Sequence, residues 1–338
     1  MTSSLAKGNG QFPPRRYAVA FRTHIWDGYV ARQYRRLVER APGGDVYILL
    51  DETNGPVPVC EEERPRVVSH TQAGCKALGL ADAGVGNMLW YNGDYPLYYF
   101  YREQPDYDYY VMAEYDVAVH GSIDAMVART ARDGVGFVGL TKGEAVGEWP
   151  HTSSLLDAYA VEDVRKRLIC FSIFSADAVR TLLEGRLAQS RVLAERAMQR
   201  WPYCEGYIPT ELALQGFKLA ELSELGSTDF YDWKPAVAET DLPALQHHTF
   251  VHPVLDERRY VQAMLRENWS MKDVLDPHSE LLRRLRRVPL GVYGPPLVAA
   301  LRTRLKKRVS GALQARREKR VPATLGVWGG GSQGPRRG

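Results

Sequence analysis

The chain has 338 residues, of which 45% are hydrophobic and 25% are charged, and its formal net charge at pH 7 is +4. This is an ordinary globular composition, long enough for one large α/β domain or two smaller ones. The four cysteines are scattered and never spaced as C-x-x-C, which argues against a zinc site or a disulfide framework and favours a reducing cytoplasm. The segment MTSSLAKGNGQFPPRR lacks the apolar core of a signal peptide, and no apolar run is long enough to span a membrane.

A strand and a helix are predicted after a disordered arm over residues 1–16. Residues 17–21 (YAVAF) have the apolar run of a buried strand, and Arg22 and Thr23 follow at its C-terminal end, where open α/β sheets place their ligands. Residues 27–41 are predicted to form a helix with Asp27 as its N-cap. The apolar face of this helix comprises Tyr29, Val30, Tyr34, Leu37 and Val38.

A second strand is predicted at residues 46–50, and it ends at Asp51. A carboxylate at the C-terminal end of a strand is well placed to accept a hydrogen bond from a ribose hydroxyl or a base. It can equally close a turn, and the following Asn54-Gly55 favours that alternative. A short strand at 67–69 and a helix at 71–79 come next.

Residues 88–103 (MLWYNGDYPLYYFYRE) are unusually rich in aromatic side chains. A helix that begins near Asp94 or Tyr95, with Pro96 in its first turn, fits this segment. The rings could stack on a base or a sugar, but packing between helix and sheet is the favoured role for most of them.

Residues 107–120 (YDYYVMAEYDVAVH) contain the predicted central strand, in which two carboxylates, Glu114 and Asp116, stand one residue apart. Residues i and i+2 of a strand point to the same face, so both acids are predicted to project together at the end of a buried strand, before the apolar run resumes at 117–119. A hard divalent cation such as Mg²⁺ or Mn²⁺ would neutralise them. An exposed edge or a helix cap is the alternative.

The second half of the chain continues the alternation of strands and helices. Its predicted elements are a helix at 122–132 capped by Ser122, a strand at 136–140, a strand at 168–174 (LICFSIF) and a helix from 175 to about 199. The segment WPYCEGYIPTEL then introduces Glu205 and Glu211 ahead of another helix. Three histidines cluster around a short strand in HHTFVHPV, and residues 255–282 are predicted to be helical.

This order of parts resembles a GT-A glycosyltransferase of the bacterial surface-polysaccharide type over residues 17–254. The first half ends at Glu114-Tyr115-Asp116, which is similar to the D-x-D motif that holds the metal and the sugar diphosphate. Glu205 resembles the acid near the acceptor in inverting members, and His252 resembles the late metal or phosphate ligand. The first D-x-D position is Glu, and FRTHIWDG replaces the first-strand motif of the commonest bacterial family.

The resemblance implies an α/β fold, namely a Rossmann-related mixed sheet flanked by helices and followed by a basic helical tail. The implied domains are a catalytic domain at 17–265, with a nucleotide-binding half at 17–120 and an acceptor half at 121–265, a helical extension at 266–320 and a disordered tail at 321–338. The implied activity is metal-dependent transfer of a sugar from a nucleotide-sugar donor to a glycan or a lipid-linked glycan, as in polysaccharide biosynthesis.

The resemblance also assigns roles to side chains. A Mn²⁺ or Mg²⁺ ion on Asp116 and His252 would act as a Lewis acid on the leaving diphosphate. The donor would be bound by Arg22, Thr23, Asp51 and Glu114. Glu205 is the first choice for the base that takes the acceptor proton and Glu211 the second, although a helix cap or a surface ion pair would also explain Glu205.

Two other functions use the same features. A nucleotidyltransferase would employ the same acid pair, but the loop THIWDGY after the first strand lacks the glycines and lysine that would favour it. A non-catalytic carbohydrate- or membrane-binding protein would use the aromatic rings as a sugar platform. Neither G-x-G-x-x-G nor G-x-x-x-x-G-K-[ST] occurs, which disfavours dinucleotide binding and P-loop chemistry.

The basic residues are concentrated at the C-terminal end, where 15 Lys or Arg and one acid from Arg283 onward give a balance of +14, against −10 for the rest. Residues 295–313 are predicted to form a basic amphipathic helix with Pro295 in its first turn. We expect residues 295–320 to dock on an anionic membrane surface, which would make this a cytoplasmic protein held peripherally at the inner face of the membrane. A domain-packed helix is the alternative, and the lack of aromatic residues in this helix disfavours nucleic acid.

Overall fold

The computed structural model describes residues 16–82, 84, 88–141, 143–195, 199–267 and 269–318, with the side chains of 307–309 and 311–318 left undescribed. Apart from Arg16, the arm predicted for residues 1–16 lies outside this part of the chain, and so does the tail predicted for residues 321–338.

The chain divides into two compact units, the first ending at Asp256 and the second beginning at Glu257. The boundary predicted after residue 265 falls inside helix α8 (Glu257–Arg266), which is part of the second unit and packs on α11 (Leu290–Glu318). This helix buries an apolar face formed by Tyr260, Val261 and Met264, which accounts for its place in that unit.

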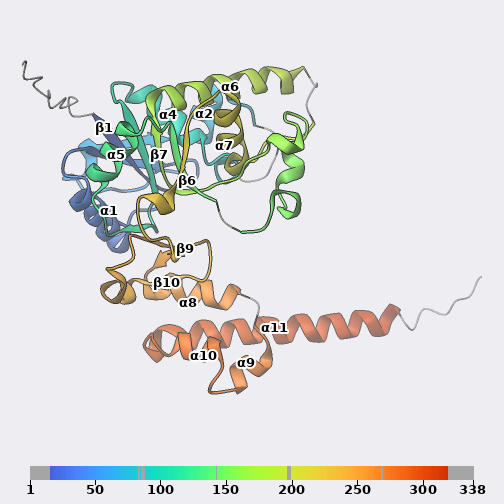
Figure 1. Ribbon diagram of the computed structural model, residues 1–338. Coiled ribbons are helices and arrows are strands. Elements are labelled where there is room, and N and C mark those ends of the chain that lie inside the picture. Colours follow the sequence, from blue (N-terminus) through green and yellow to red (C-terminus); the bar gives the residue numbers. More distant parts are fainter. Residues whose placement is uncertain are drawn as a thin grey trace, which may run out of the picture. The chain divides into compact units, whose positions relative to one another are not determined.

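The first unit is built on a seven-stranded mixed sheet with the order β3-β2-β1-β4-β7-β6-β8 (Figure 1). Its strands are β1 (Tyr17–Thr23), β2 (Asp45–Asp51), β3 (Val67–His70), β4 (Tyr109–Glu114), β6 (Phe137–Leu140), β7 (Leu168–Ser175) and β8 (Leu219–Glu221). Strand β7 runs antiparallel to both of its neighbours, and the other pairs are parallel. The strand order reverses between β1 and β4, which is the position where open α/β sheets bind ligands.

Alternating side chains of the sheet face two hydrophobic cores. In β1, Ala18 and Ala20 pack into one core, and Val19 and Phe21 pack into the other. The helices over the first core are α2 (Gln72–Ala77), α3 (Met88–Tyr91), α4 (Tyr95–Glu103), α6 (Ala176–Ala194) and α7 (Cys204–Leu214), and those over the second are α1 (Gly28–Arg40) and α5 (Ile123–Arg132) (Figure 1). The unit therefore has three layers, which confirms the predicted mixed sheet flanked by helices.

Two small sheets carry the late segment of the first unit. Strand β5 (Ala118–Val119) pairs with β11 (Phe250–His252), which pairs with β9 (Phe230–Tyr231), and β10 (Val237–Ala238) pairs with β12 (Val254–Leu255). The backbone N–H of Val254 also donates to the carbonyl of Asp116 at 2.7 Å. These contacts bring the predicted histidine segment to the end of β4, although the two segments are far apart in the sequence.

The central strand ends earlier than predicted. Strand β4 stops at Glu114, and the N–H of Val117 donates back to the carbonyl of Glu114 at 3.0 Å, which forms a turn. Asp116 lies in this turn, and the apolar run that follows pairs in a different sheet. The prediction that both acids share one strand face is therefore wrong, because the turn ends the ladder, but both acids do lie at the carboxyl edge of the sheet.

Local capping chemistry sets several helix starts as predicted. The side chain of Asp27 accepts two backbone N–H groups in the first turn of α1, and Ser122 accepts the N–H of Ala125 at the start of α5. The predicted apolar face of α1 is buried at Tyr29, Val30, Tyr34 and Leu37. Val38 is instead 39% exposed, because it lies at the edge of that face.

The second unit is helical, and its remaining helices are α9 (Met271–Leu275) and α10 (Glu280–Leu285). Helix α11 begins at Leu290, so Pro295 lies inside it rather than in its first turn, which corrects the predicted start. Pro289 opens the helix instead, and its carbonyl accepts the N–H of Val292 at 2.8 Å. Among the residues described, no helix is long and apolar enough to cross a membrane.

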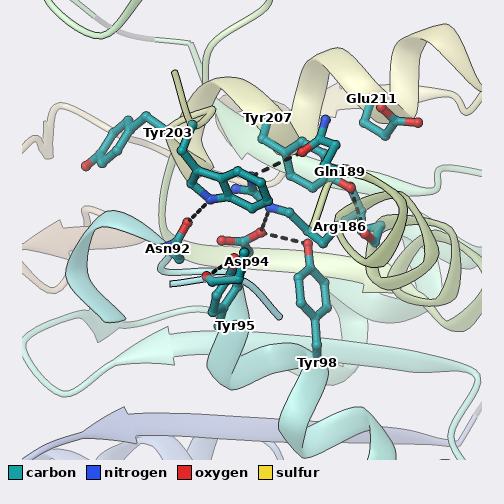
Figure 2. A network of polar contacts seen from close by, with 12 residues as sticks. Asn92, Asp94, Tyr95, Tyr98, Arg186, Gln189, Tyr203, Tyr207 and Glu211 are labelled. Carbon is teal, nitrogen blue, oxygen red and sulfur yellow. Dashed lines mark hydrogen bonds and ion pairs between the residues drawn. The ribbon is translucent and has the colours of Figure 1, made fainter. Parts of the chain in front are cut away.

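A fully buried ion pair joins α6 to the start of α4 (Figure 2). Arg186 and Asp94 are both 0% exposed, and Nε of Arg186 donates to Oδ2 of Asp94 at 2.7 Å. Tyr98 donates to the same carboxylate oxygen at 2.9 Å, and the guanidinium carbon lies 3.7 Å from the ring centroid of Tyr207. The pair therefore holds the turn that precedes α4 against α6 and α7.

We expect Arg186→Met to lower the free energy of unfolding by about 3–5 kcal/mol, because the carboxylate of Asp94 would remain buried without its partner. Chemical denaturation followed by circular dichroism measures this change. Arg180→Met, at an exposed position of the same helix, is the matched control and should cost less than about 1 kcal/mol. Equal losses in the two variants would contradict the prediction.

Candidate active site

A pocket of about 280 Å³, the first pocket, opens at the carboxyl ends of β1, β2 and β4. Its lining comprises Arg22, Thr23, His24, Asp51, Asn54, His70, Leu89, Trp90, Pro96, Glu114, Tyr115 and Asp116. The structure thus brings together five of the side chains that the sequence predicts for a site, namely Arg22, Thr23, Asp51, Glu114 and Asp116. They meet because the carboxyl ends of neighbouring parallel strands lie at one edge of the sheet.

Arg22 is fixed by three acceptors. Its Nη2 donates to the carbonyl of Leu89 at 2.8 Å, and its Nη1 lies 3.2 Å from the carbonyl of Gly93 and 3.3 Å from Oε1 of Glu114. A Cβ at Gly93 would lie 3.1 Å from Nη1 of Arg22 and 3.3 Å from Sγ of Cys204, so a larger residue would have to displace these side chains by a few tenths of an ångström. Arg22 is therefore both the ion-pair partner of Glu114 and a clamp on the segment before α4.

Thr23 and Asp51 take part in local turns as well as in the pocket. The hydroxyl of Thr23 donates to the carbonyl of Ile25 at 2.7 Å, and Oδ1 of Asp51 accepts the N–H of Thr53 at 2.9 Å. The turn-closing alternative for Asp51 is therefore present in the structure, together with its position in the pocket lining.

His252 faces Asp116 with Nε2 of its ring. Its Nδ1 lies 2.6 Å from the carbonyl oxygen of Asp232, which can only accept, so in the neutral ring Nδ1 carries the proton. Its Nε2 lies 3.7 Å from Oδ1 of Asp116, an atom that is buried and has no hydrogen-bond partner. The two predicted metal ligands are therefore neighbours, and the lone pair of His252 points into the acid cluster.

Cys170 of β7 joins this cluster, although nothing in the sequence predicts it. A carboxylate oxygen of Glu114, the Sγ of Cys170 and a ring nitrogen of His252 all lie within 4.8 Å of one another. Because Phe171 of β7 pairs with Ala113 of β4, Cys170 comes next to the end of β4. In the apolar run LICFSIF, a ligand cysteine has the same pattern as a core cysteine.

Burial disfavours the negatively charged forms of the groups in this cluster. Burial raises the pKa of Asp116 to about 6, and it raises the pKa of the Cys170 thiol well above its usual range. A buried carboxylate oxygen without a partner, beside a further carboxylate and an imidazole nitrogen, is a donor set that fits a divalent cation. The residues present therefore fit the predicted metal, which Asp116, His252 and Glu114 would hold.

A second pocket of about 60 Å³ contains Glu205. Its lining comprises Gly143, Glu144, Trp149, Lys166, Arg167, Leu168, Glu205, Asp232 and Trp233. Glu205 lies in the first turn of α7 rather than ahead of the helix. Burial, reinforced by the charge of Glu114, raises the pKa of Glu205 to about 8, and the opposing charge of Lys166 offsets only part of this rise.

Glu211, the second predicted base, lies elsewhere (Figure 2). Its carboxylate accepts a hydrogen bond from Tyr159 at 2.8 Å and another from Gln215 at 3.0 Å, and it lines neither pocket. An α-helix has 3.6 residues per turn, so side chains six positions apart point in clearly different directions. Glu211 therefore points away from the pocket that Glu205 lines, and Glu205 remains the first choice for the predicted base.

His70 also lines the first pocket, although it is not among the site residues predicted from the sequence. It is 2% exposed, and neither ring nitrogen has a hydrogen-bond partner. Burial lowers its pKa to about 4, so its ring is neutral at pH 7. Its place at the end of β3, opposite Asp51 of β2, is the signal that would have found it.

Comparisons with known proteins give a remote likeness in fold. No protein-family model and no curated protein matches the chain. Among solved structures, mouse xyloside xylosyltransferase 1 in its apo form matches with a TM-score of 0.38 at 11% identity, covering 70% of this chain and 97% of that one. The galactosyltransferase LgtC, in complex with donor and acceptor sugar analogues, matches with a TM-score of 0.37 at 11% identity, covering 68% and 78%.

We expect Glu205→Gln to stabilise the metal-free protein at about pH 8 but not at about pH 5. The pKa of Glu205 rises from 4.5 to about 8 on folding, so between these values the folded state keeps a proton that the unfolded state has lost. The free energy of unfolding of the natural protein therefore falls with rising pH across this window, by at most about 1.4 kcal/mol per pH unit. Because glutamine does not titrate, Glu205→Gln removes this fall in the free energy of unfolding.

Melting temperatures measured across this pH range with a chelator present provide the test. Glu211→Gln, on another side of the same helix, is the matched control and should follow the natural protein. A stability difference between Glu205→Gln and the natural protein that does not change with pH would show that Glu205 is not protonated by burial.

Proposed function

We propose that this chain is a metal-dependent glycosyltransferase that moves a sugar from a nucleotide-sugar donor to a hydroxyl of a glycan or lipid-linked glycan. The observation that carries the proposal is that each of two pockets is lined by an acid and that these two acids interact electrostatically. Glu114 lines the first pocket and Glu205 lines the second, and they are close enough for the charge of Glu114 to raise the pKa of Glu205. Group transfer needs such an arrangement, in which donor and acceptor reach the same point from two sides.

The donor would occupy the first pocket. Asp51 and Thr23 stand at strand ends, where nucleotide groups bind in open α/β sheets. Arg22 supplies a fixed positive charge toward the diphosphate. His70 offers two ring nitrogens that have no hydrogen-bond partner among the described residues, so it is suited to hydrogen-bond a polar group of the donor.

The metal, Mn²⁺ or Mg²⁺ in the simplest form of this proposal, would be held by Asp116 and His252 with Glu114. When bound there, such an ion neutralises the charge that develops on the leaving diphosphate. The side chains themselves orient the donor: Arg22 holds Glu114 in place, and the carbonyl of Asp232 holds the ring of His252.

Glu205 is the proposed general base. It shares a pocket lining with Lys166, and burial raises its pKa to about 8, which suits proton transfer from a hydroxyl near neutral pH. The indoles of Trp149 and Trp233 in the same lining are suited to pack against a sugar ring of the acceptor.

We expect Asp116→Ala to abolish transfer and metal-dependent nucleotide-sugar binding while the fold remains intact.

We expect Glu205→Gln to lower kcat at least about 100-fold with little effect on donor affinity, because a base acts in the transition state. A thermal-shift screen of nucleotide sugars with and without Mn²⁺ identifies the donor, and release of the nucleoside diphosphate then measures turnover. Glu211→Gln is the matched control, and full activity of Asp116→Ala or activity indifferent to chelators would refute the metal mechanism.

We further propose that α11 places the protein on an anionic membrane at the cytoplasmic face, near a lipid-linked acceptor. Val298 and Leu305 are 47% and 49% exposed, and Arg302 and Lys306 are exposed beside them. Arg304 is engaged within the unit instead, since it donates to the carbonyl of Trp269 and lies over its ring. An exposed set of apolar and basic side chains on one helix supports binding to a lipid interface.

We expect the full chain to float with liposomes that contain anionic lipid at low salt, and Arg302→Gln/Lys306→Gln to bind several-fold more weakly, since each basic residue contributes about 1 kcal/mol near such a surface. Arg40→Gln/Arg102→Gln removes two exposed charges from the first unit and is the matched control. Recovery of the natural protein in the soluble fraction would show that α11 does not bind anionic membranes.

A further inference from the structure

We propose that the Cys170 thiolate is a ligand of the cation bound by the acid cluster, and that this sulfur makes the site select a first-row transition-metal ion such as Zn²⁺, Fe²⁺ or Co²⁺ over Mg²⁺. This inference rests on the metal part of the proposed function and deepens it, because it names the ligand set and the class of metal.

The donor atoms are already close to a coordination geometry. The oxygen of Glu114, the Sγ of Cys170 and the nitrogen of His252 lie within 4.8 Å of one another. Ligand atoms at about 2.0–2.3 Å from a tetrahedral metal are separated from each other by about 3.3–3.8 Å. Small side-chain rotations therefore suffice to bring the three atoms onto one ion.

The ligands come from rigid elements that the fold holds together. Glu114 ends β4, Cys170 lies in β7, and His252 ends β11. The β4–β7 pairing sets the place of the sulfur, and the hydrogen bond from Val254 to Asp116 ties the histidine segment to the turn after β4. A site built on strands keeps its geometry better than one built on loops.

The environment of His252 is that of a metal ligand. Metal-binding histidines generally donate their second ring N–H to a carbonyl or carboxylate, and Nδ1 of His252 does so to Asp232. This leaves Nε2 as the ligand atom, facing Oδ1 of Asp116, which has no hydrogen-bond partner. Asp116 is therefore suited to complete a fourth position.

The sulfur decides the class of metal. Carboxylate oxygens alone suit Mg²⁺, whereas thiolate and imidazole ligands favour softer or borderline ions. When the ion binds, a metal–sulfur bond forms, the S–H bond of Cys170 breaks, and the proton leaves to solvent. No electron is transferred in this step, so no oxidant or reductant is needed.

Titration of the chelator-treated full chain with Co²⁺ tests the proposal independently of activity. We expect visible d–d bands together with a near-ultraviolet thiolate-to-cobalt charge-transfer band. In Cys170→Ser the charge-transfer band should disappear and Co²⁺ affinity should fall at least about tenfold, the scale on which such sites respond to altered ligation. Cys60→Ser, which removes an exposed thiol, is the matched control and should retain the band.

Competition separates the metals. Zn²⁺ should displace Co²⁺ from the natural protein, whereas Mg²⁺ in large excess should not. In Cys170→Ser the difference in affinity between Zn²⁺ and Mg²⁺ should be smaller. If circular dichroism shows that Cys170→Ser does not fold, Cys170→Ala replaces it. The charge-transfer band of the natural protein, compared with that of Cys60→Ser, then still decides whether Cys170 is a ligand.

Each remaining outcome has one meaning. A charge-transfer band that is absent from the natural protein, or that survives in Cys170→Ser, overturns the inference, and so does failure to bind Co²⁺. A thiolate band without turnover of any nucleotide sugar supports the inference and counts against the proposed function. Metal-dependent transfer without a thiolate band preserves the function and removes Cys170 from the ligand set.

Discussion

Burial of negative charge at the carboxyl edge of the sheet is the constraint on which the candidate site depends. Burial raises the pKa of Asp116 and of Glu205, and Cys170 lies in the same cluster. Arg22 contacts Glu114, but two backbone carbonyls already share its guanidinium. A buried carboxylate is costly unless a proton or a cation offsets it. In the free protein the buried acids are therefore stabilised by protonation, and a cation, when one is supplied, can take the place of the protons.

Asp94 shows how the same fold treats a buried acid that has a permanent partner. Arg186 forms a buried ion pair with it within a shell of aromatic rings, although Oδ1 of Asp94 has no hydrogen-bond partner among the described residues (Figure 2). The balanced pair holds the turn whose Gly93 carbonyl accepts from Arg22, so it acts on the first pocket through position rather than contact. A balanced pair thus stabilises the scaffold, while the unbalanced cluster at the pockets remains available for ligands.

Local patterns were enough to predict much of the first pocket. Apolar runs end near the ends of strands, so the polar residues at the carboxyl ends of β1, β2 and β4 could be assigned to one edge of the sheet. Cys170 could not be found in this way, because a buried ligand residue inside an apolar strand has the same pattern as a core residue. The sequence alone could not rank Glu205 against Glu211 by position, because only the helix shows that side chains six positions apart point in different directions.

The partners of Asp116 depend on contacts that no local pattern reveals. His252 reaches the site because β11 pairs with β5, and the sulfur of Cys170 reaches it because β7 pairs antiparallel with β4. The three candidate ligands beside Asp116 therefore meet only when these long-range pairings have formed. An ion that binds this arrangement and not the unfolded chain adds its binding free energy to folding. The charge that destabilises the empty cluster is thus the same charge that would make a bound cation stabilise the late segment against the sheet.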